Sequence, residues 1–199
     1  MNDDPFAPLR SMRGARDAID AINKKPRWIS VVPVPIDAPP PPPVHPTLGA
    51  PSAIWTYRDT TGTVLAYMHR FEPKTFRPLT LWRNADDKLR WRWESLPCKR
   101  SLYGLWRLAE RPSAQVLVCE GEGSVDAATY LLPEFVAVTS PNGSKSASKA
   151  DWSPLKGRAV TVWPDRDTAG LDYARQVAKL AAAAGARSVA IVPHRGMRK

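Results

Sequence analysis

Three acidic residues follow two short apolar runs of the sequence. Val116–Cys119 is followed directly by Glu120, and Val160–Trp163 is followed, after a proline, by Asp165 and Asp167. Residues i and i+2 of an extended segment point to the same side, so Asp165 and Asp167 can face one ion. Carboxylates held close together repel each other, and carboxylate oxygens are the ligands that hard divalent cations prefer. The pattern therefore predicts a Mg²⁺ (or Mn²⁺) site for phosphate chemistry.

The two apolar runs are expected to be strands of one parallel sheet, with a third strand between them in the sequence. Short runs rich in β-branched residues and closed by Gly or Pro are typical of buried strands. Strands of this kind alternate with helical patterns, which predicts a parallel sheet with helices on its faces. Ligands bind at the carboxyl ends of such strands, where we expect the three acids to meet. The expected strands are 116–119, 136–139, 159–163 and 188–192, and the expected helices are 124–132, 146–150 and 168–184.

Each acidic motif also has a purely structural interpretation. In Glu120-Gly121-Glu122-Gly123, Glu120 can be a metal ligand or a general base. Glu122 is then an auxiliary acid that we expect to be accessible at the surface. A Gly-rich turn with solvated acids would look the same. Asp167 can instead cap the helix that follows it, and capping does not exclude metal binding.

A polar loop, Ser140–Lys145, follows the strand expected at 136–139. It would lie at the same sheet edge as the acids, which makes Lys145 a candidate phosphate contact. The loop does not fit the G-x-x-x-x-G-K-[ST] pattern, so an ATPase P-loop is not expected.

The charge of the chain favours a nucleic-acid partner. There are 29 Lys and Arg against 19 Asp and Glu, a net charge of +10, although a basic protein without such a partner would have the same balance. Residues 46–111 are expected to form a small β-rich basic domain, with a hairpin at 54–71 around D-T-T-G. Leu89–Trp93 alternates apolar and basic residues, as a half-buried strand with a solvated face also would. The predicted contacts to a nucleic-acid backbone are Arg90, Arg92, Lys99 and Arg100.

The amino-terminal part is expected to be an arm outside the folded core. Residues 33–46 contain eight prolines, which predicts a polyproline II linker within a flexible arm over 1–45, with one possible helix at 11–22. The two cysteines, Cys98 and Cys119, form no C-x-x-C motif, so zinc is not expected. With no long apolar run or export signal, we expect a cytoplasmic protein without a membrane partner.

The acidic motifs resemble a known domain. V-L-V-C-E-G followed by V-T-V-W-P-D-R-D-T-A-G is similar to the TOPRIM domain shared by DnaG-type primases, topoisomerases and some nucleases. Upstream, Tyr57–Arg70 and Lys99–Leu105 (K-R-S-L-Y-G-L) are similar to segments of bacterial primase catalytic cores, so the resemblance spans Ile54 to Val192. Many primase-type TOPRIM domains have an acid four residues after the strand-end glutamate. Here that position is Ser124, and Asp126 lies two residues further on.

The resemblance implies both a fold and a site. The expected fold is α/β, with a TOPRIM (Rossmann-like) parallel sheet over 112–199 preceded by the basic domain over 46–111. It also implies that Asp165 and Asp167 hold Mg²⁺ and that Glu120 is a ligand or an acid/base group.

Three functions are compatible with these features. The leading hypothesis is a primase-like nucleotidyltransferase that uses Mg²⁺ on a nucleic-acid template, in the replication of a phage, plasmid or integrated element. Its partners would be single-stranded DNA or another nucleic acid, nucleotides, and a replicative helicase in trans. The alternatives are a TOPRIM nuclease and a non-catalytic nucleic-acid-binding replication accessory or host-interaction module.

Overall fold

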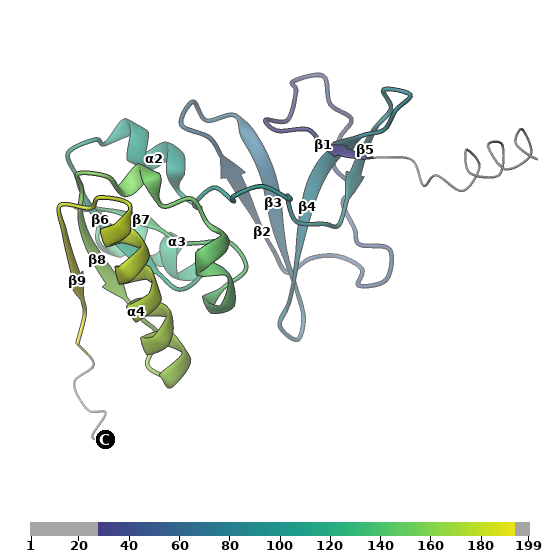
Figure 1. Ribbon diagram of the computed structural model, residues 1–199. Helices are drawn as coiled ribbons and strands as arrows, with labels where there is room; N and C mark the ends of the chain where they lie inside the picture. Colours follow the sequence, from purple (N-terminus) through teal and green to yellow (C-terminus); the bar gives the residue numbers. More distant parts are fainter. Residues whose placement is uncertain (1–27, 194–199) are drawn as a thin grey trace, which may run out of the picture.

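The chain folds into an antiparallel β part and an α/β part that lie side by side (Figure 1). The computed structural model describes residues 28–193, so the helix expected at 11–22 lies outside the described residues. Within that range, no helix is long and apolar enough to span a lipid bilayer. The longest described helix, α4, has 16 residues.

The β part is one five-stranded sheet in which β4 is central. The strands follow the order β1-β4-β3-β2, and β5 also pairs with β4. The expected hairpin is confirmed as β2 and β3, and its turn is closed by Asp59, whose carboxylate accepts the N–H groups of Thr61 and Thr63 at 2.8 and 2.9 Å. The strands are β1 (Ile29–Ser30), β2 (Ala53–Arg58), β3 (Val64–Phe71), β4 (Thr75–Arg83) and β5 (Leu89–Arg92).

The Pro-rich segment from residue 28 onward packs on this sheet, which corrects the expectation of a spacer outside the folded core. Strand β1 pairs with the end of β4, and Trp91 Nε1 donates a hydrogen bond of 2.7 Å to the carbonyl of Pro39. Further along, the ring centroid of His45 lies 4.7 Å from that of Trp93. A proline has no N–H to donate, but its carbonyl still accepts. The tryptophans that the sequence places on β5 and just beyond it supply the donor and a ring contact.

The α/β part is the expected four-stranded parallel sheet, in the order β7-β6-β8-β9. Its strands are β6 (Gln115–Cys119), β7 (Phe135–Val138), β8 (Ala159–Trp163) and β9 (Ser188–Ile191). The helical elements are α2 (Leu105–Glu110), α3 (Glu122–Leu131), α4 (Thr168–Ala183) and the short 3₁₀ helices η1 (Ser144–Lys149) and η2 (Ser153–Leu155).

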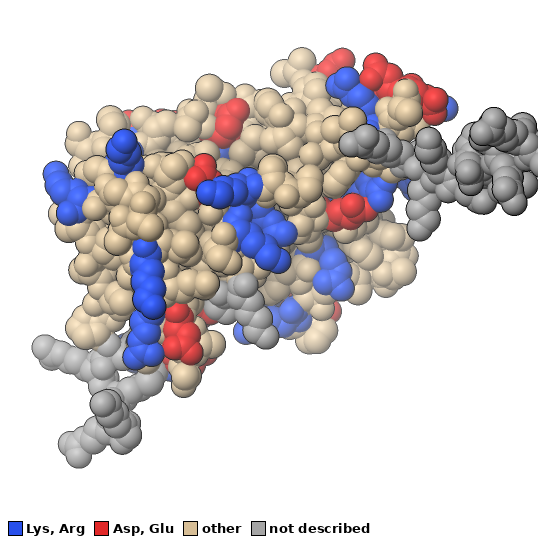
Figure 2. All heavy atoms as spheres, in the orientation of Figure 1, with Lys and Arg blue, Asp and Glu red and all other residues tan. Residues whose placement is uncertain are grey.

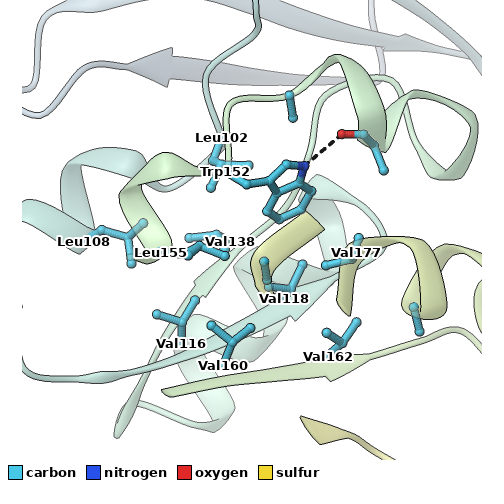
Figure 3. Close-up of a cluster of buried hydrophobic side chains, with 14 of the residues drawn as sticks. Leu102, Leu108, Val116, Val118, Val138, Trp152, Leu155, Val160, Val162 and Val177 are labelled. Carbon is cyan, nitrogen blue, oxygen red and sulfur yellow. Dashed lines mark hydrogen bonds between the residues drawn. The ribbon is translucent and has the colours of Figure 1, made fainter. Parts of the chain in front are cut away.

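Alternate residues of each strand face opposite sides of the sheet, and the two sides form different cores. Val116 and Val118 of β6 pack on the side covered by α4, η1 and η2, where Trp152 Nε1 donates a 2.8 Å hydrogen bond to the carbonyl of Ala147 (Figure 3). Leu117 and Cys119 pack on the other side, against α3. This second cluster also contains residues of the β part, so one core joins the two parts: Tyr57, Leu65 and Met68.

The L-Y-G-L segment connects the two parts through a glycine. Gly104 begins α2 with a φ of 85°, and a Cβ at this position would lie 2.6 Å from the carbonyl oxygen of Ala137. Only glycine combines this backbone conformation with so close an approach to β7. The neighbouring residues Leu102 and Tyr103 can therefore be buried, one in each core.

Candidate functional site

A cleft of about 630 Å³ lies between the two parts, at the carboxyl edge of the parallel sheet. One wall belongs to the α/β part and carries three acids, and the other wall is a face of the β sheet. The acidic wall includes Glu120, Glu122 and Asp165, and the opposite wall includes Trp55, Met68, Arg70, Lys74 and Phe76.

Glu120 and Asp165 lie next to each other at the first turn of α4. A Cβ on Gly170 would lie 2.9 Å from Glu120 Oε2 and 2.5 Å from the carbonyl oxygen of Asp165. No side chain would fit there, so the glycine of the D-T-A-G sequence lets α4 begin against both acidic residues. Oε2 of Glu120 is buried, and the Asp165 residue is exposed. The structure thus brings together two of the three predicted ligands.

Buried polar groups, the Tyr173 hydroxyl and the Cys119 thiol, lie beneath the surface next to these two acids. The Tyr173 hydroxyl donates to the carbonyl of Cys119 at 3.3 Å and lies 3.0 Å from Ser140 Oγ. Burial raises the pKa of Tyr173, and the charge of Glu120 adds to the rise. Burial, together with the charge of Asp165, raises the pKa of the Cys119 thiol to about 12. Both groups are therefore uncharged near neutral pH, and the negative charge of this wall comes from the carboxylates.

Asp167 occupies the N-cap of α4, where its Oδ1 accepts the N–H of Gly170 at 2.7 Å. It is not among the residues that line the cleft. Over residues 28–193, no three Asp, Glu, His or Cys side chains converge closely enough to hold a metal ion. The capping role that the sequence left open is present, and the assignment of Asp167 as a ligand stays a prediction.

Glu122 differs from its expected place at the surface. It is 5% exposed, and its Oε1 accepts a 2.7 Å hydrogen bond from the hydroxyl of Tyr57 on β2. Burial raises the pKa of Glu122, and the Tyr57 hydrogen bond partly offsets that rise. The hydrogen bond gives this acid a structural role, because it links α3 to the β part.

Asp126 makes a second connection one helical turn further along α3. Its Oδ2 accepts from Trp55 Nε1 and its Oδ1 from the Tyr103 hydroxyl, each at 2.8 Å. One carboxylate thus holds β2 and the L-Y-G-L segment together on α3. The sequence left Asp126 without a role.

Comparison with known proteins identifies the fold. No protein-family model matches the sequence, and none of the curated proteins matches it either. A structure of bacteriophage T7 lagging-strand DNA polymerase interacting with primase domains of two gp4 subunits, bound to an RNA/DNA hybrid and dTTP, matches at 17% identity and a TM-score of 0.52, over 73% of this chain and 67% of that chain. The zinc-binding and RNA polymerase domains of Aquifex aeolicus primase match at 16% identity and a TM-score of 0.52, over 77% and 38%. A DnaG primase catalytic domain bound to ssDNA matches at 23% identity and a TM-score of 0.47, over 70% and 44%.

The chain has a primase-like fold. It spans 67% of the T7 chain and less than half of the other two. At these identities the likeness concerns the fold, and function must be argued from the residues of the site.

On this primase-like fold, four of the predicted basic contacts are not among the residues that line the cleft: Arg90, Arg92, Lys99 and Arg100. Arg92 pairs with Glu94, and its guanidinium carbon lies 5.2 and 5.5 Å from the ring centroids of Trp28 and Trp82. Arg90 is exposed on β5. Of these two arginines, Arg90 is the one that presents its charge to solvent.

Of the remaining predicted cations, Lys99 and Arg100 lie in the segment that joins the two parts, between β5 and α2, and Lys145 lies in η1. Lys99 is exposed, and Arg100 is half-buried beside a small apolar cavity next to Tyr57 and Asn142. The side chain of Lys145 is outside the described part of the structure. Figure 2 shows Lys and Arg side chains gathered between the two parts on one face of the molecule. Binding of nucleic acid by these predicted residues stays a prediction.

The basic and aromatic wall of the cleft was missed by the sequence analysis. Arg70 ends the segment that resembles primase cores, which was the available signal for it. Lys74 lies in the turn between β3 and β4, and Phe76 lies on β4. That strand contains Pro78, and a proline within a run argues against a strand in a sequence.

Proposed function

We propose that this protein is a primase-like enzyme that performs Mg²⁺-dependent nucleotidyl transfer on a nucleic-acid template, in the replication of a phage, plasmid or integrated element. One observation carries the proposal. The cleft of a primase-like fold places Glu120 and Asp165 across from Arg70 and Lys74. A metal bound by the acids and cations on the facing wall would together neutralise a phosphate chain between them.

The residues present are compatible with Mg²⁺. This ion usually keeps several waters and is bound through one or two carboxylates plus substrate phosphates, so Glu120 and Asp165 are a sufficient protein contribution. Once bound, Mg²⁺ would polarise the phosphoryl group and offset charge on the leaving pyrophosphate. Asp167 remains a proposed additional ligand, since its cap uses Oδ1.

The other residues of the chain would bind and orient the substrates. Arg70 and Lys74 would contact phosphates inside the cleft, while Arg90, Lys99 and Arg100 would contact the template backbone outside it. The proposed partners are single-stranded DNA or another nucleic acid, nucleotides, and a replicative helicase in trans.

The test is primer synthesis by the Asp165→Asn variant, with Asp172→Asn as the matched control. Asp172 is exposed on α4, where it pairs with Arg175 at 3.2 Å, outside the cleft. With a single-stranded template, labelled nucleotides and Mg²⁺, we expect Asp165→Asn to abolish product formation and Asp172→Asn to leave it unchanged. Undiminished primer yield from Asp165→Asn would refute the proposal.

The same reaction separates the alternatives. A nuclease would shorten a labelled strand in the presence of Mg²⁺ and without nucleotides, and Asp165→Asn would stop the shortening. A non-catalytic module would bind the strand in EDTA and yield neither longer nor shorter products.

A further inference from the structure

The basic wall of the cleft carries a pair of aromatic rings. Trp55 and Phe76 are stacked, with ring centroids 6.3 Å apart and an interplanar angle of 20°. Phe76 remains 37% exposed, and both rings line the cleft. Offset stacking at this separation is favourable in itself, but it leaves ring surface open to the cleft.

The pairing of the strands places both rings on one face of the sheet with a cation between them. Trp55 is opposite Met68, and Phe76 is opposite Arg70. Directly opposite residues of antiparallel strands share a face, as do residues two apart on β3. Trp55, Arg70 and Phe76 are therefore neighbours on the surface that faces the acids.

The orientation of Trp55 is set before any ligand arrives. Its Nε1 donates to Asp126 at 2.8 Å, and a Cβ on Gly123 would lie 3.9 Å from the edge of its ring. The polar atom of the indole is thus satisfied, and its ring is held at the edge of α3. A ring held in this way loses little conformational entropy when a flat ligand stacks on it.

We propose that Trp55 and Phe76 form a base-stacking platform for single-stranded nucleic acid, and that Arg70 and Lys74 contact the adjoining phosphates. Every base has a π face, so an aromatic surface beside cations binds a strand with little regard to sequence. This inference rests on the proposed function and names how the strand is held in its cleft.

The test compares oligonucleotides that share their phosphates but differ in their bases. The probes are a fluorescein-labelled oligothymidylate, an abasic oligonucleotide of equal length, and an oligouridylate, all without added metal. Loss of one stacked base corresponds to about 5- to 150-fold weaker binding. We expect Phe76→Ala to weaken oligothymidylate binding within that range and to leave abasic binding unchanged. The oligouridylate shows whether the platform accepts RNA as well as DNA.

Further variants separate stacking from general effects of mutation. Phe76→Leu retains apolar volume without a π face and should bind as weakly as Phe76→Ala, whereas Phe76→Trp should restore binding. Tyr130→Ala removes a ring that is 84% exposed on α3, outside the cleft, and should change nothing. Arg70→Ala should weaken binding of both DNA probes. It should also reduce the slope of log K against log salt concentration by about the amount expected for one phosphate contact.

The proposal is overturned if Phe76→Ala weakens abasic and oligothymidylate binding equally, or alters neither. Its outcome is independent of catalysis, because Asp165→Asn should still bind oligothymidylate in EDTA. A variant that loses primer synthesis but still binds the strand tests the proposed role of the acids. A variant that loses the preference for oligothymidylate over the abasic probe tests the platform.

Discussion

The hydroxyl of Tyr57 on β2 donates a 2.7 Å hydrogen bond to the buried carboxyl of Glu122 on α3. The two residues are 65 positions apart in the chain and lie on opposite sides of the junction between the β part and the α/β part. Burial favours the uncharged form of each, since it raises the pKa of both groups. This buried polar pair therefore links the acidic wall to the aromatic wall and makes the junction sensitive to pH.

The raised pKa of Glu122 gives a stability contribution with a definite sign. A carboxyl whose pKa is higher in the folded state stabilises the fold below its unfolded pKa of about 4.3, and this contribution is lost as pH rises through the raised value. Glu122→Gln keeps an acceptor for Tyr57 and removes the titration. We expect the variant's free energy of unfolding at pH 7 to equal or exceed that of the parent, with a flatter pH profile above about pH 4.3. Urea denaturation across pH measures this, and an unchanged profile would contradict it.

Removal of the donor should have the opposite effect. Tyr57→Phe leaves the buried Glu122 carboxylate without its hydroxyl partner, so we expect a loss of about 1–3 kcal/mol at pH 7. The loss should be smaller near pH 4, where the carboxyl is protonated. The same denaturation series measures it, and Tyr67→Phe on β3 is a control at a tyrosine for which no hydroxyl hydrogen bond is observed. Equal losses at the two pH values would show that the charge of Glu122 is not involved.

Gly170 is expected to tolerate no side chain. The new methyl group of Gly170→Ala would lie 2.5 Å from the carbonyl oxygen of Asp165 and 2.9 Å from Glu120 Oε2. A forced shift of this kind costs about 1–3 kcal/mol, and here it would also displace both acids and lower the proposed Mg²⁺-dependent activity. Gly123→Ala is the control for stability, because nothing lies closer than 3.9 Å to its Cβ position. It should be neutral or stabilising by up to about 1 kcal/mol. Thermal melting of the two variants checks the contrast, and similar melting temperatures would contradict it.

Asp167 can be tested separately as a cap and as a ligand. Asp167→Ala removes the acceptor for Gly170 N–H and should destabilise the fold by about 0.5–2 kcal/mol. Asn is an equally good cap, so Asp167→Asn should retain the parent's melting temperature. If Asp167 also binds Mg²⁺, the Asn variant loses activity and Mn²⁺ affinity while remaining stable. If Asp167→Asn keeps full activity and metal affinity, Asp167 acts only as the N-cap of α4 and is not a ligand.

The two cysteines are expected to differ in reactivity. Cys98 is exposed, whereas Cys119 is buried in β6 with a pKa raised to about 12. A disulfide reagent at pH 8 should titrate one thiol per native chain and two after unfolding, because the thiolate is the reactive form. Cys98→Ser should abolish the fast reaction. Rapid modification of Cys119 in that variant would show that β6 opens easily.

The parallel sheet was predictable because its signals are local. Strand β8 begins at Ala159 and ends at Trp163, as expected, because Gly157 and Pro164 limit the apolar run on its two sides. Glu120 and Asp165 could be paired for the same reason, because the ends of parallel strands share an edge. In contrast, the sequence around Glu122 carries no sign of its burial, because its partner Tyr57 comes from the other part of the chain.

The opposite wall could not be predicted from the sequence because it depends on tertiary contacts. Because β4 contains Pro78, its sequence does not read as a strand. That Phe76 lies beside Arg70 follows only from the register of β3 and β4. The Pro-rich segment is placed likewise by distant partners, such as Trp91 for Pro39. Proline composition alone predicts a linker wherever no such partner is known.

Helix α3 carries part of the acidic wall and is joined twice to strand β2 of the opposite wall, through Glu122 to Tyr57 and through Asp126 to Trp55. These two hydrogen bonds hold the acidic wall against the sheet that carries the aromatic rings. We therefore expect a strand that binds in this cleft, as proposed, to enter without a hinge closure of the two parts. Under the proposed function, such a strand could then advance by one nucleotide without separation of the two parts, which is the movement that stepwise extension of a primer would require.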